Sequence, residues 1–460
     1  MKKLIGDKKF YMMVLAVAVP IMIQNGITNF VSLLDNIMVG QVGTQQMSGV
    51  AIVNQLMFVF NICIFGGVSG AGIFTAQFYG CKDTKGVRNT FRMKLMIVFV
   101  MTIIGLIVFA LKGEDLIRLY LHETGNSAEL EATLIYAKQY MRIMMIEMLP
   151  FSIIQAYAGT LRETGETVVP MKAGVAAVFV NLVLNYILIF GKFGAPVLGV
   201  EGAAIATTIS RFVELGIVVV WTHHHKEKNN FVCGAYRSLK VPMNLVGKII
   251  LMGMPLMLNE ALWASGQAVL AQCYSVRGLA VVAAFNISST IFNVFCVVYI
   301  ALGSSVGIIV GQLLGAGKME EAKDTDRKLI FFSVASCVLI GLLMAGFSFF
   351  FPMLYNTEPD IRHLATKFIQ IVALCMPISA FVHATYFTLR SGGKTWITFI
   401  FDSVFVWVVT IPLAFVMTRY TNQSIIVIYF LCQMVDIIKC VIGFVLVKKG
   451  VWMHSIVSKE

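Results

Sequence analysis

Charged residues are scarce in this chain of 460 residues. They make up 13% of the sequence, against 58% for hydrophobic residues, whereas a soluble domain carries about a quarter charged residues. The mean hydropathy of +0.82 agrees with this shortage. A chain with so few charges cannot cover a large water-facing surface, so we expect most of its surface to face lipid.

Motifs of several enzyme and pump classes are also absent. The sequence has no GxxxxGKS/T loop that could use ATP and no HExxH zinc motif. Its nine cysteines form no CxxC pair and lie mostly in apolar segments, which indicates packing residues rather than disulfides or metal ligands. We therefore expect no enzyme activity, no catalytic residues, no resident metal and no organic cofactor.

The net charge of +12 raises the question of a nucleic-acid partner. No basic run interleaved with aromatic residues marks such a surface, and excess Lys and Arg are typical of membrane-protein loops. We expect no nucleic-acid partner and a lipid bilayer instead. The basic N-terminus resembles a signal peptide, but the apolar run from Phe10 to Leu34 is too long and lacks a small-residue cleavage site. We interpret it as a retained membrane helix.

Hydropathy divides the chain into twelve apolar segments, each long enough to cross a bilayer, for which about 20 residues suffice. An all-α membrane protein with twelve transmembrane helices is therefore predicted. The predicted spans are 10–34, 48–79, 93–111, 130–160, 170–191, 198–222, 246–271, 279–311, 328–351, 363–389, 396–417 and 424–447.

Basic residues are concentrated in the connections that follow even-numbered spans. The second connection holds Lys82, Lys85 and Arg88, whereas Glu114 and Asp115 lie in the third. Because Lys and Arg are enriched in cytoplasmic loops, both termini are predicted to be cytoplasmic.

The longest polar stretch, His223–Lys248, lies in the middle of the chain. It predicts an N-terminal six-helix lobe at 1–225, a cytoplasmic linker at 226–245 and a C-terminal six-helix lobe at 246–460. Three adjacent histidines, His223–His225, cannot all face one metal ion from a regular helix, so we expect a solvated loop there.

The two halves of the chain repeat each other. The pattern GIxxxQxxG occurs at Gly72–Gly80 and Gly307–Gly315, and TLRxxGxT occurs at Thr160–Thr167 and Thr388–Thr395. Because each repeat has an even number of spans, both enter the membrane in the same direction. This predicts parallel repeats, with a substrate path between the lobes near the midplane.

Polar residues recur at three- and four-residue steps along the first span, which places them on one helical stripe. They are Asn25, Thr28, Asn29, Ser32, Asp35 and Asn36. Polar groups in hydrocarbon are expensive and usually face a bundle interior or a water-filled cavity. Asp35 could take up a proton or coordinate Na⁺ there, or it could instead cap the helix at the outer interface. Asn181 and Asn185 on the fifth span could complete the cavity or only hold the bundle together.

A second polar stripe, on the seventh span, contains Asn259, Glu260 and Trp263. Glu260 lies five residues after Pro255, inside the membrane, so we favour a functional role. Trp263 could stack on a planar cationic substrate.

Two further polar residues of the second half are candidates for the cavity. Asn286 lies on the eighth span and Asp402 on the eleventh. Asp402 could line the cavity or lie near the cytoplasmic interface.

Two charged pairs are interpreted as structural. Arg211 and Glu214, and likewise Asp436 and Lys439, are three residues apart. Each pair can neutralise itself on its own helix, which reduces the cost of burial.

With these motifs the chain resembles the multidrug and toxic compound extrusion (MATE) family. The resemblance rests on Leu34–Gly40, which reads LDNIMVG, on Gly72–Gly80, on Leu161–Gly165 and on the small-residue run Gly199–Thr207. It covers essentially the whole chain.

The resemblance implies a V-shaped pair of six-helix bundles in a prokaryotic inner (plasma) membrane. It implies a monomer that exports organic cations or drugs against inward H⁺ or Na⁺ flow, by alternating access. A flippase of lipid-linked oligosaccharide precursors, from the same superfamily, is the alternative.

The resemblance also implies roles for individual residues. Asp35 falls where prokaryotic members carry a coupling aspartate, and Glu260 lies about one turn before the second-lobe acid of other members. The chain departs from the family where Asn185 replaces an acid on the fifth span and Ser379 replaces the span-ten acid of Na⁺-coupled members. The coupling ion therefore stays open between H⁺ and Na⁺.

Overall fold

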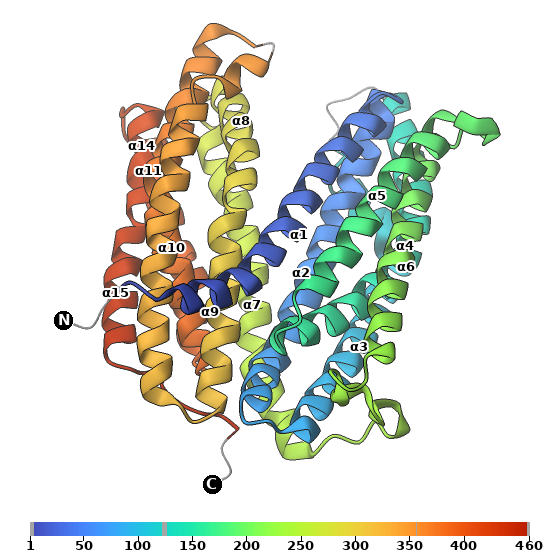
Figure 1. Ribbon diagram of the computed structural model, residues 1–460. Coiled ribbons are helices and arrows are strands. Elements are labelled where there is room, and N and C mark those ends of the chain that lie inside the picture. The colour runs from blue at the N-terminus through green and yellow to red at the C-terminus, as the bar shows by residue number, and fades with distance from the viewer. Residues whose placement is uncertain (1–3, 122–126, 356, 458–460) are drawn as a thin grey trace. The chain divides into compact units, whose positions relative to one another are not determined.

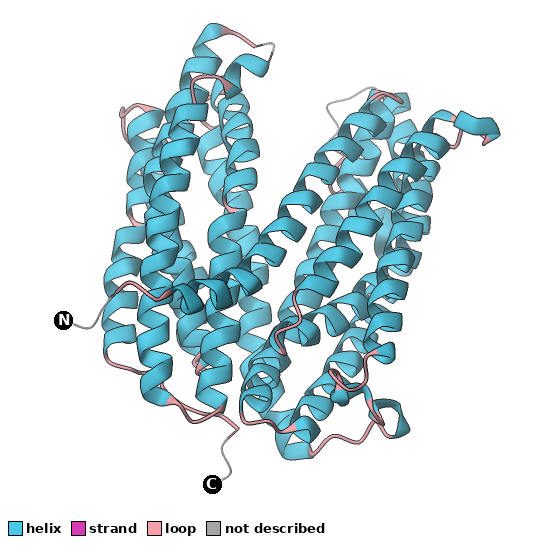
Figure 2. Ribbon diagram, viewed as in Figure 1, coloured by secondary structure: helices cyan, strands magenta, loops and turns pink. Residues whose placement is uncertain are grey.

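Helices make up almost all of the structure (Figures 1 and 2). The computed structural model describes residues 4–121, 127–355 and 357–457, without the side chains of residues 31–33, 36, 37 and 127. No strand occurs in these ranges, which confirms the predicted all-α class. The longer helices are α1 (Lys8–Gly40), α2 (Thr44–Gly80), α3 (Thr84–Arg118), α4 (Ser127–Glu163), α5 (Val168–Phe190), α6 (Gly199–His224), α7 (Met243–Ser275), α8 (Leu279–Phe295), α9 (Val297–Gly315), α10 (Met319–Phe347), α11 (Pro359–Ser391), α13 (Ile411–Tyr420), α14 (Ile425–Met434) and α15 (Asp436–Lys448).

Shorter helical elements connect or interrupt these helices. They are the 3-10 helices η1 (Lys192–Gly194), η2 (Asn230–Val232), η3 (Ala235–Arg237) and η4 (Phe351–Leu354), the single turn α12 (Thr395–Phe399), and the π-helical η5 (Ile400–Val404) and η6 (Val406–Thr410). The eleventh predicted span consists of α12, η5, η6 and α13 in sequence.

Twelve helical segments in the described part of the chain are long and apolar enough to cross a membrane. They correspond to the twelve predicted spans, with ends that mostly differ by several residues. The eighth segment, Val297–Gly315, starts well after the predicted residue 279, because Leu279–Phe295 forms a separate, shorter helix. Besides the eleventh, two further predicted spans are broken into consecutive helices: α8 and α9 meet at Cys296, and α14 and α15 meet at Val435. The chain is therefore a multi-pass membrane protein.

The chain divides into two compact units. Unit 1 comprises Met1–Met22, Ala76–Asp83 and Lys248–Glu460, and unit 2 comprises Ile23–Thr75 and Thr84–Gly247. The units follow the two halves of the sequence, except that the start of α1 and the end of α2 belong with the second half. The lobe and linker boundaries at residues 225 and 245 stay a prediction.

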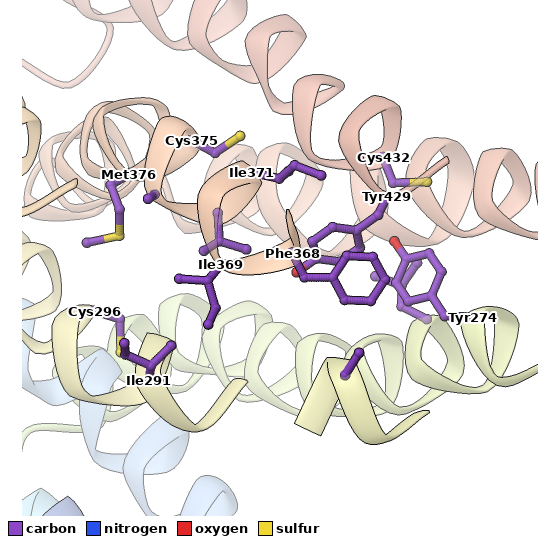
Figure 3. Packing of buried hydrophobic residues seen from close by; sticks show 14 of the residues in the cluster. Tyr274, Ile291, Cys296, Phe368, Ile369, Ile371, Cys375, Met376, Tyr429 and Cys432 are labelled. Atoms are coloured by element: carbon purple, nitrogen blue, oxygen red, sulfur yellow. The ribbon is translucent and has the colours of Figure 1, made fainter. Parts of the chain in front are cut away.

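Aliphatic, aromatic and sulfur-containing side chains together form the main core of unit 1 (Figure 3). The Tyr429 ring lies 4.6 Å from that of Phe368 and 5.4 Å from that of Tyr274, measured between centroids. Cys375 and Cys432 are buried in the same cluster. All nine cysteines are free.

The start of α1 packs into a second core of unit 1. Val14, Ala18 and Ile21 are buried there against residues of α9 such as Leu302 and Val306. These apolar side chains explain why the first turns of α1 belong to unit 1.

Unit 2 has its own core, formed mainly by α2, α3 and α4. Met141, Met144 and Met148 lie at three- and four-residue steps on one face of α4 and are buried with Phe60 of α2. This regular apolar face positions α4, the helix that carries part of the polar site described below.

The central polar stretch is docked on unit 2. Arg92 of α3 donates to the carbonyl oxygens of Gly234 (2.7 Å) and Ala235 (2.8 Å). His223 belongs to α6, stacks on Tyr236 and contacts the Tyr157 hydroxyl, and burial raises the pKa of Tyr236. The expectation of a solvated loop is therefore wrong for His223, because its ring is held by aromatic neighbours.

The repeated GIxxxQxxG pattern marks a close helix crossing within unit 1. A Cβ atom placed on Gly80 would lie 1.9 Å from the Gln312 carbonyl oxygen, and one placed on Gly315 would lie 1.9 Å from the Gln77 carbonyl oxygen. The last glycine of each repeat thus lies against the glutamine backbone of the other. Only glycine leaves room for this approach of α2 to α9.

Gln77 also fixes the end of the chain. Its side-chain nitrogen donates to the Ser391 carbonyl oxygen (2.9 Å), and its side-chain oxygen accepts from the Ile456 backbone nitrogen (2.8 Å). Trp452, which is 1% exposed, lies against Gly392. The C-terminal segment Trp452–Ile456 is therefore part of unit 1.

Substituting Gly80→Ala or Gly315→Ala should destabilise the protein by about 1–3 kcal/mol, because the added methyl group overlaps backbone atoms that cannot move aside. The loss can be measured as a lower melting temperature with a thiol-reactive fluorophore that reports exposure of the buried cysteines. Gly346→Ala is the matched control, since no atom lies within 4 Å of its added Cβ. Equal melting temperatures for all three variants would contradict the close crossing.

Candidate functional site

Asp35 lies at the end of a chain of hydrogen bonds inside unit 2. Asn185 of α5 donates from Nδ2 to Asp35 Oδ1 (2.5 Å) and to Asn181 Oδ1 (3.2 Å). Asn181 in turn donates to Thr207 Oγ1 of α6 (3.2 Å). The structure therefore brings Asp35, Asn181 and Asn185 together. Their hydrogen bonds join α1, α5 and α6.

The other predicted residues of the first span are less enclosed. Asn25 is half-buried and Asn29 is exposed. The side chain of Ser32 lies outside the described residues. The sites predicted at Asn25, Asn29 and Ser32 therefore stay predictions.

A second polar group of unit 2 contains two glutamates and one arginine. Arg211 of α6 donates to Glu147 Oε1 of α4 (3.1 Å) and to Glu214 Oε2 (2.8 Å). Both glutamate side chains are only 4% exposed, and the Arg211 guanidinium lies over the Phe151 ring at 5.6 Å. The interpretation of Arg211 and Glu214 as an ion pair is confirmed, but the pair has a third member in Glu147. We call these three residues the Glu–Arg–Glu group.

Unit 1 holds a comparable group around Asp402. Asn259 Nδ2 donates to Asp402 Oδ2 (3.1 Å), and Lys439 Nζ lies 3.5 Å from Asp402 Oδ1 and 3.5 Å from Asp436 Oδ1. Lys439 is therefore shared between two carboxylates. The prediction that Asp436 and Lys439 neutralise each other is incomplete, because Asp402 competes for the same ammonium group.

The backbone around Asp402 is π-helical rather than α-helical, in η5 and η6. Ser403 donates from its hydroxyl to the Asn259 carbonyl oxygen (2.7 Å) and from its backbone nitrogen to Asn259 Oδ1 (3.3 Å). Short π-helical segments are rare and frequent at functional sites. Here the π-helical segment allows both Asp402 and Ser403 to form hydrogen bonds with Asn259 of α7.

The remaining predicted residues of unit 1 differ in their surroundings. Glu260 is half-buried, and Arg390 and Asp402 lie within its electrostatic range. Trp263 is 40% exposed, and Asn286 is exposed on α8. The structure thus brings Asn259, Glu260 and Asp402 to one region, while Trp263 and Asn286 present open surfaces.

Sequence reasoning missed two buried acids. Glu147 has its basic partner on another helix, 64 residues away. Asp326 of α10 is 1% exposed and accepts a hydrogen bond from the Thr388 hydroxyl (2.5 Å). Thr388 lies in the repeated TLRxxGxT pattern, and its counterpart Thr160 accepts from Lys94 (3.1 Å). Thr160 and Thr388 occupy equivalent places in the two repeats, so a search for the polar partner of each threonine could have identified Asp326.

Apolar helices with charged and amide side chains buried between them are typical of polytopic transporters. The family model named MatE matches the chain twice, at residues 20–187 and 255–416. The two matches begin at Pro20 and Pro255, and each contains one copy of the GIxxxQxxG pattern and one copy of the TLRxxGxT pattern. The chain belongs to the MatE family, the family that its motifs resemble.

Curated relatives are similar over most of their length. The probable multidrug resistance protein NorM of Thermotoga maritima is 26% identical over 418 residues, which cover 89% of this chain and 86% of the relative. The probable multidrug resistance protein YoeA of Bacillus subtilis is 25% identical over 412 residues, which cover 89% and 87%.

Solved structures share the fold. An outward-facing multidrug resistance MATE family transporter of the MOP superfamily superimposes with a TM-score of 0.86 at 18% identity, with 97% of both chains covered. A MOP superfamily transporter from Pyrococcus furiosus, described as having a binding pocket of reverse polarity, gives a TM-score of 0.83 at 18% identity and the same coverage. At this identity the likeness shows the fold alone.

Substituting Arg211→Met should destabilise the protein by about 3–5 kcal/mol at neutral pH, because two buried carboxylates lose their shared cation. The loss should shrink as the pH falls, since a protonated carboxyl group needs no cation. Chemical or thermal unfolding in detergent at several pH values measures both effects. Lys112→Met is the control, because Lys112 pairs with Asp115 at an exposed site, with side chains 70% and 65% exposed, and such pairs contribute little. A variant as stable as this control would show that the group is not needed for folding.

Proposed function

We propose that the chain is a secondary active multidrug exporter. It antiports organic cations or drugs against H⁺ or Na⁺, by alternating access between its two lobes. The observation that carries the proposal is the Asp35 carboxylate, which lies among membrane-spanning helices and is held by the amide of Asn185. An amide orients a carboxylate without neutralising it, so the charge still attracts a proton or a cation.

We assign substrate binding to an acidic region of the second half of the chain. Asp402 shares Lys439 with Asp436, so this group carries two acids for one base, and Glu260 lies nearby. A region rich in acids with an accessible indole, Trp263, suits organic cations, which aromatic faces and carboxylates both attract. The names of the relatives in Thermotoga maritima and Bacillus subtilis, both probable multidrug resistance proteins, support the same substrate class.

The proposal includes location and assembly. The basic connections after even-numbered spans support cytoplasmic termini, and the bacterial relatives support a prokaryotic cell membrane. We propose a monomer, because each described polar group is complete within one chain. The flippase alternative has nothing specific in its favour, since the Asp402 and Glu–Arg–Glu groups each hold more acids than bases.

Asp35→Asn should reduce gradient-driven efflux of ethidium from proteoliposomes to the rate of protein-free liposomes, because an amide cannot take up the coupling ion. Efflux is followed by fluorescence under two conditions, a pH gradient without Na⁺ and a Na⁺ gradient at constant pH. The condition that drives the wild-type protein identifies the ion.

Glu260→Gln in the same assay tests the role of the second half, and Asp115→Asn, at an exposed acid, is the matched control. We expect Glu260→Gln to weaken ethidium transport under both gradients and Asp115→Asn to transport like the wild type. Asp35 is not the coupling residue if Asp35→Asn transports at the wild-type rate under every gradient.

A further inference from the structure

We propose that Glu147 is a second proton-binding carboxylate of unit 2, and that Arg211 couples its proton to the ion bound at Asp35. The proposal rests on the proposed antiport function and deepens it. It concerns the Glu–Arg–Glu group, which neither the sequence motifs nor the family match single out.

The charges of this group do not balance. Two carboxylates, of Glu147 and Glu214, share the single guanidinium of Arg211 at 3.1 and 2.8 Å. With all three ionised, the group carries one net negative charge, although both acids are 4% exposed. An uncompensated buried charge costs several kcal/mol. The Arg211 side chain is 31% exposed, but both carboxylates are enclosed, so one more positive charge bound at an acid would stabilise the group.

The free oxygen of Glu147 shows which ion fits. Glu147 Oε2 is fully enclosed and has no hydrogen-bond partner among the residues that the structure describes. A metal cation needs several oxygen ligands around it, and none of the described residues completes such a shell at this atom. A proton needs only the oxygen that it binds, so a proton is the ion that matches this site.

Glu147 rather than Glu214 is the acid that takes the proton. The Arg211 bond to Glu214 is the shorter of the two. Arg162 also lies within electrostatic range of Glu214. Glu214 is therefore the better compensated carboxylate, and Glu147 is the one whose charge remains.

The groups that face this site connect it to Asp35. Tyr140, about two helix turns before Glu147 on α4, is within electrostatic range of both Glu147 and Asp35 and donates to Asn54 of α2 (3.2 Å). Arg211 is within electrostatic range of Asp35. The charged and titratable groups that face the site are thus Arg211 and Glu214 of α6, Tyr140 and Arg162 of α4, and Asp35 of α1.

In this arrangement, a proton bound at Glu147 and an ion bound at Asp35 weaken each other's binding. When Glu147 takes a proton from water on Oε2, it becomes a neutral carboxylic acid, and Arg211 is left with Glu214 and Asp35 as its anionic neighbours. The stronger pull of Arg211 on Asp35 then weakens the binding of a cation or proton at Asp35. By linkage, an ion bound at Asp35 favours release of the proton from Glu147 to the same degree.

Infrared difference spectroscopy on the purified full-length protein tests whether Glu147 binds a proton, independently of transport. The carboxylic-acid carbonyl band is followed as the pH is raised. We expect Glu147→Gln to lose one titrating carboxylic-acid signal that the wild type shows, and Glu147→Asp to restore it. Glu131→Gln, at an exposed acid of the same helix, should keep the wild-type spectrum. Identical titrating bands in the wild type and Glu147→Gln overturn the proposal.

Asp35→Asn tests the coupling, because its neutral amide mimics an Asp35 whose charge is neutralised by an ion. We expect the Glu147 carboxylic-acid band to titrate at a lower pH in Asp35→Asn than in the wild type, because Arg211 no longer has Asp35 as a competing anion. Asp115→Asn, at an exposed acid, is the control and should match the wild type. A band that titrates at the same pH in Asp35→Asn and the wild type overturns the coupling role. A wild type that transports no ethidium under either gradient contradicts the proposed function instead, and the infrared titration still decides whether Glu147 binds a proton.

Discussion

The hydrocarbon core of a bilayer contains no water that could solvate a charge, and this constraint explains why Lys94, Arg211 and Lys439 each lie beside carboxylates. Lys94 is fully buried and is held by Glu163 and Thr160. Arg211 and Lys439 each lie between two carboxylates. The helices are thus positioned as much by these few polar contacts as by their apolar faces, because a small shift of one helix would leave a charge without its partner.

The two similar halves of the chain differ in the charged residues that they bury. Thr160 and Thr388 occupy the same place in the repeated TLRxxGxT pattern, but Thr160 accepts from Lys94 and Thr388 donates to Asp326. A hydroxyl group can donate or accept a hydrogen bond. The repeated threonine therefore fixes the position of a polar contact, but its partner can be either a base or an acid. The halves therefore share a fold while they offer ions different chemistry.

Hydropathy predicted the twelve spans, because each span must be apolar over a fixed length. Helical periodicity correctly grouped Asn181 with Asn185 and Arg211 with Glu214, since these pairs lie on a single helix. It could not show that Asn185 meets Asp35 or that Glu147 meets Arg211. Those contacts join different helices, and their geometry depends on how the helices pack rather than on any local pattern.

The glycine crossing shows how a repeated motif specifies a contact without large side chains. Gly80 and Gly315 bring α2 and α9 together backbone to backbone, so the contact tolerates no larger residue. Each glycine lies against the glutamine backbone of the other repeat, so the two copies of the motif contact each other. The end of α2 belongs to unit 1 and its remainder to unit 2, and the crossing is the contact that holds the end of α2 to α9 within unit 1. Because an added methyl group at either glycine would overlap backbone atoms, the crossing gives a physical reason for glycine at the same place in both repeats.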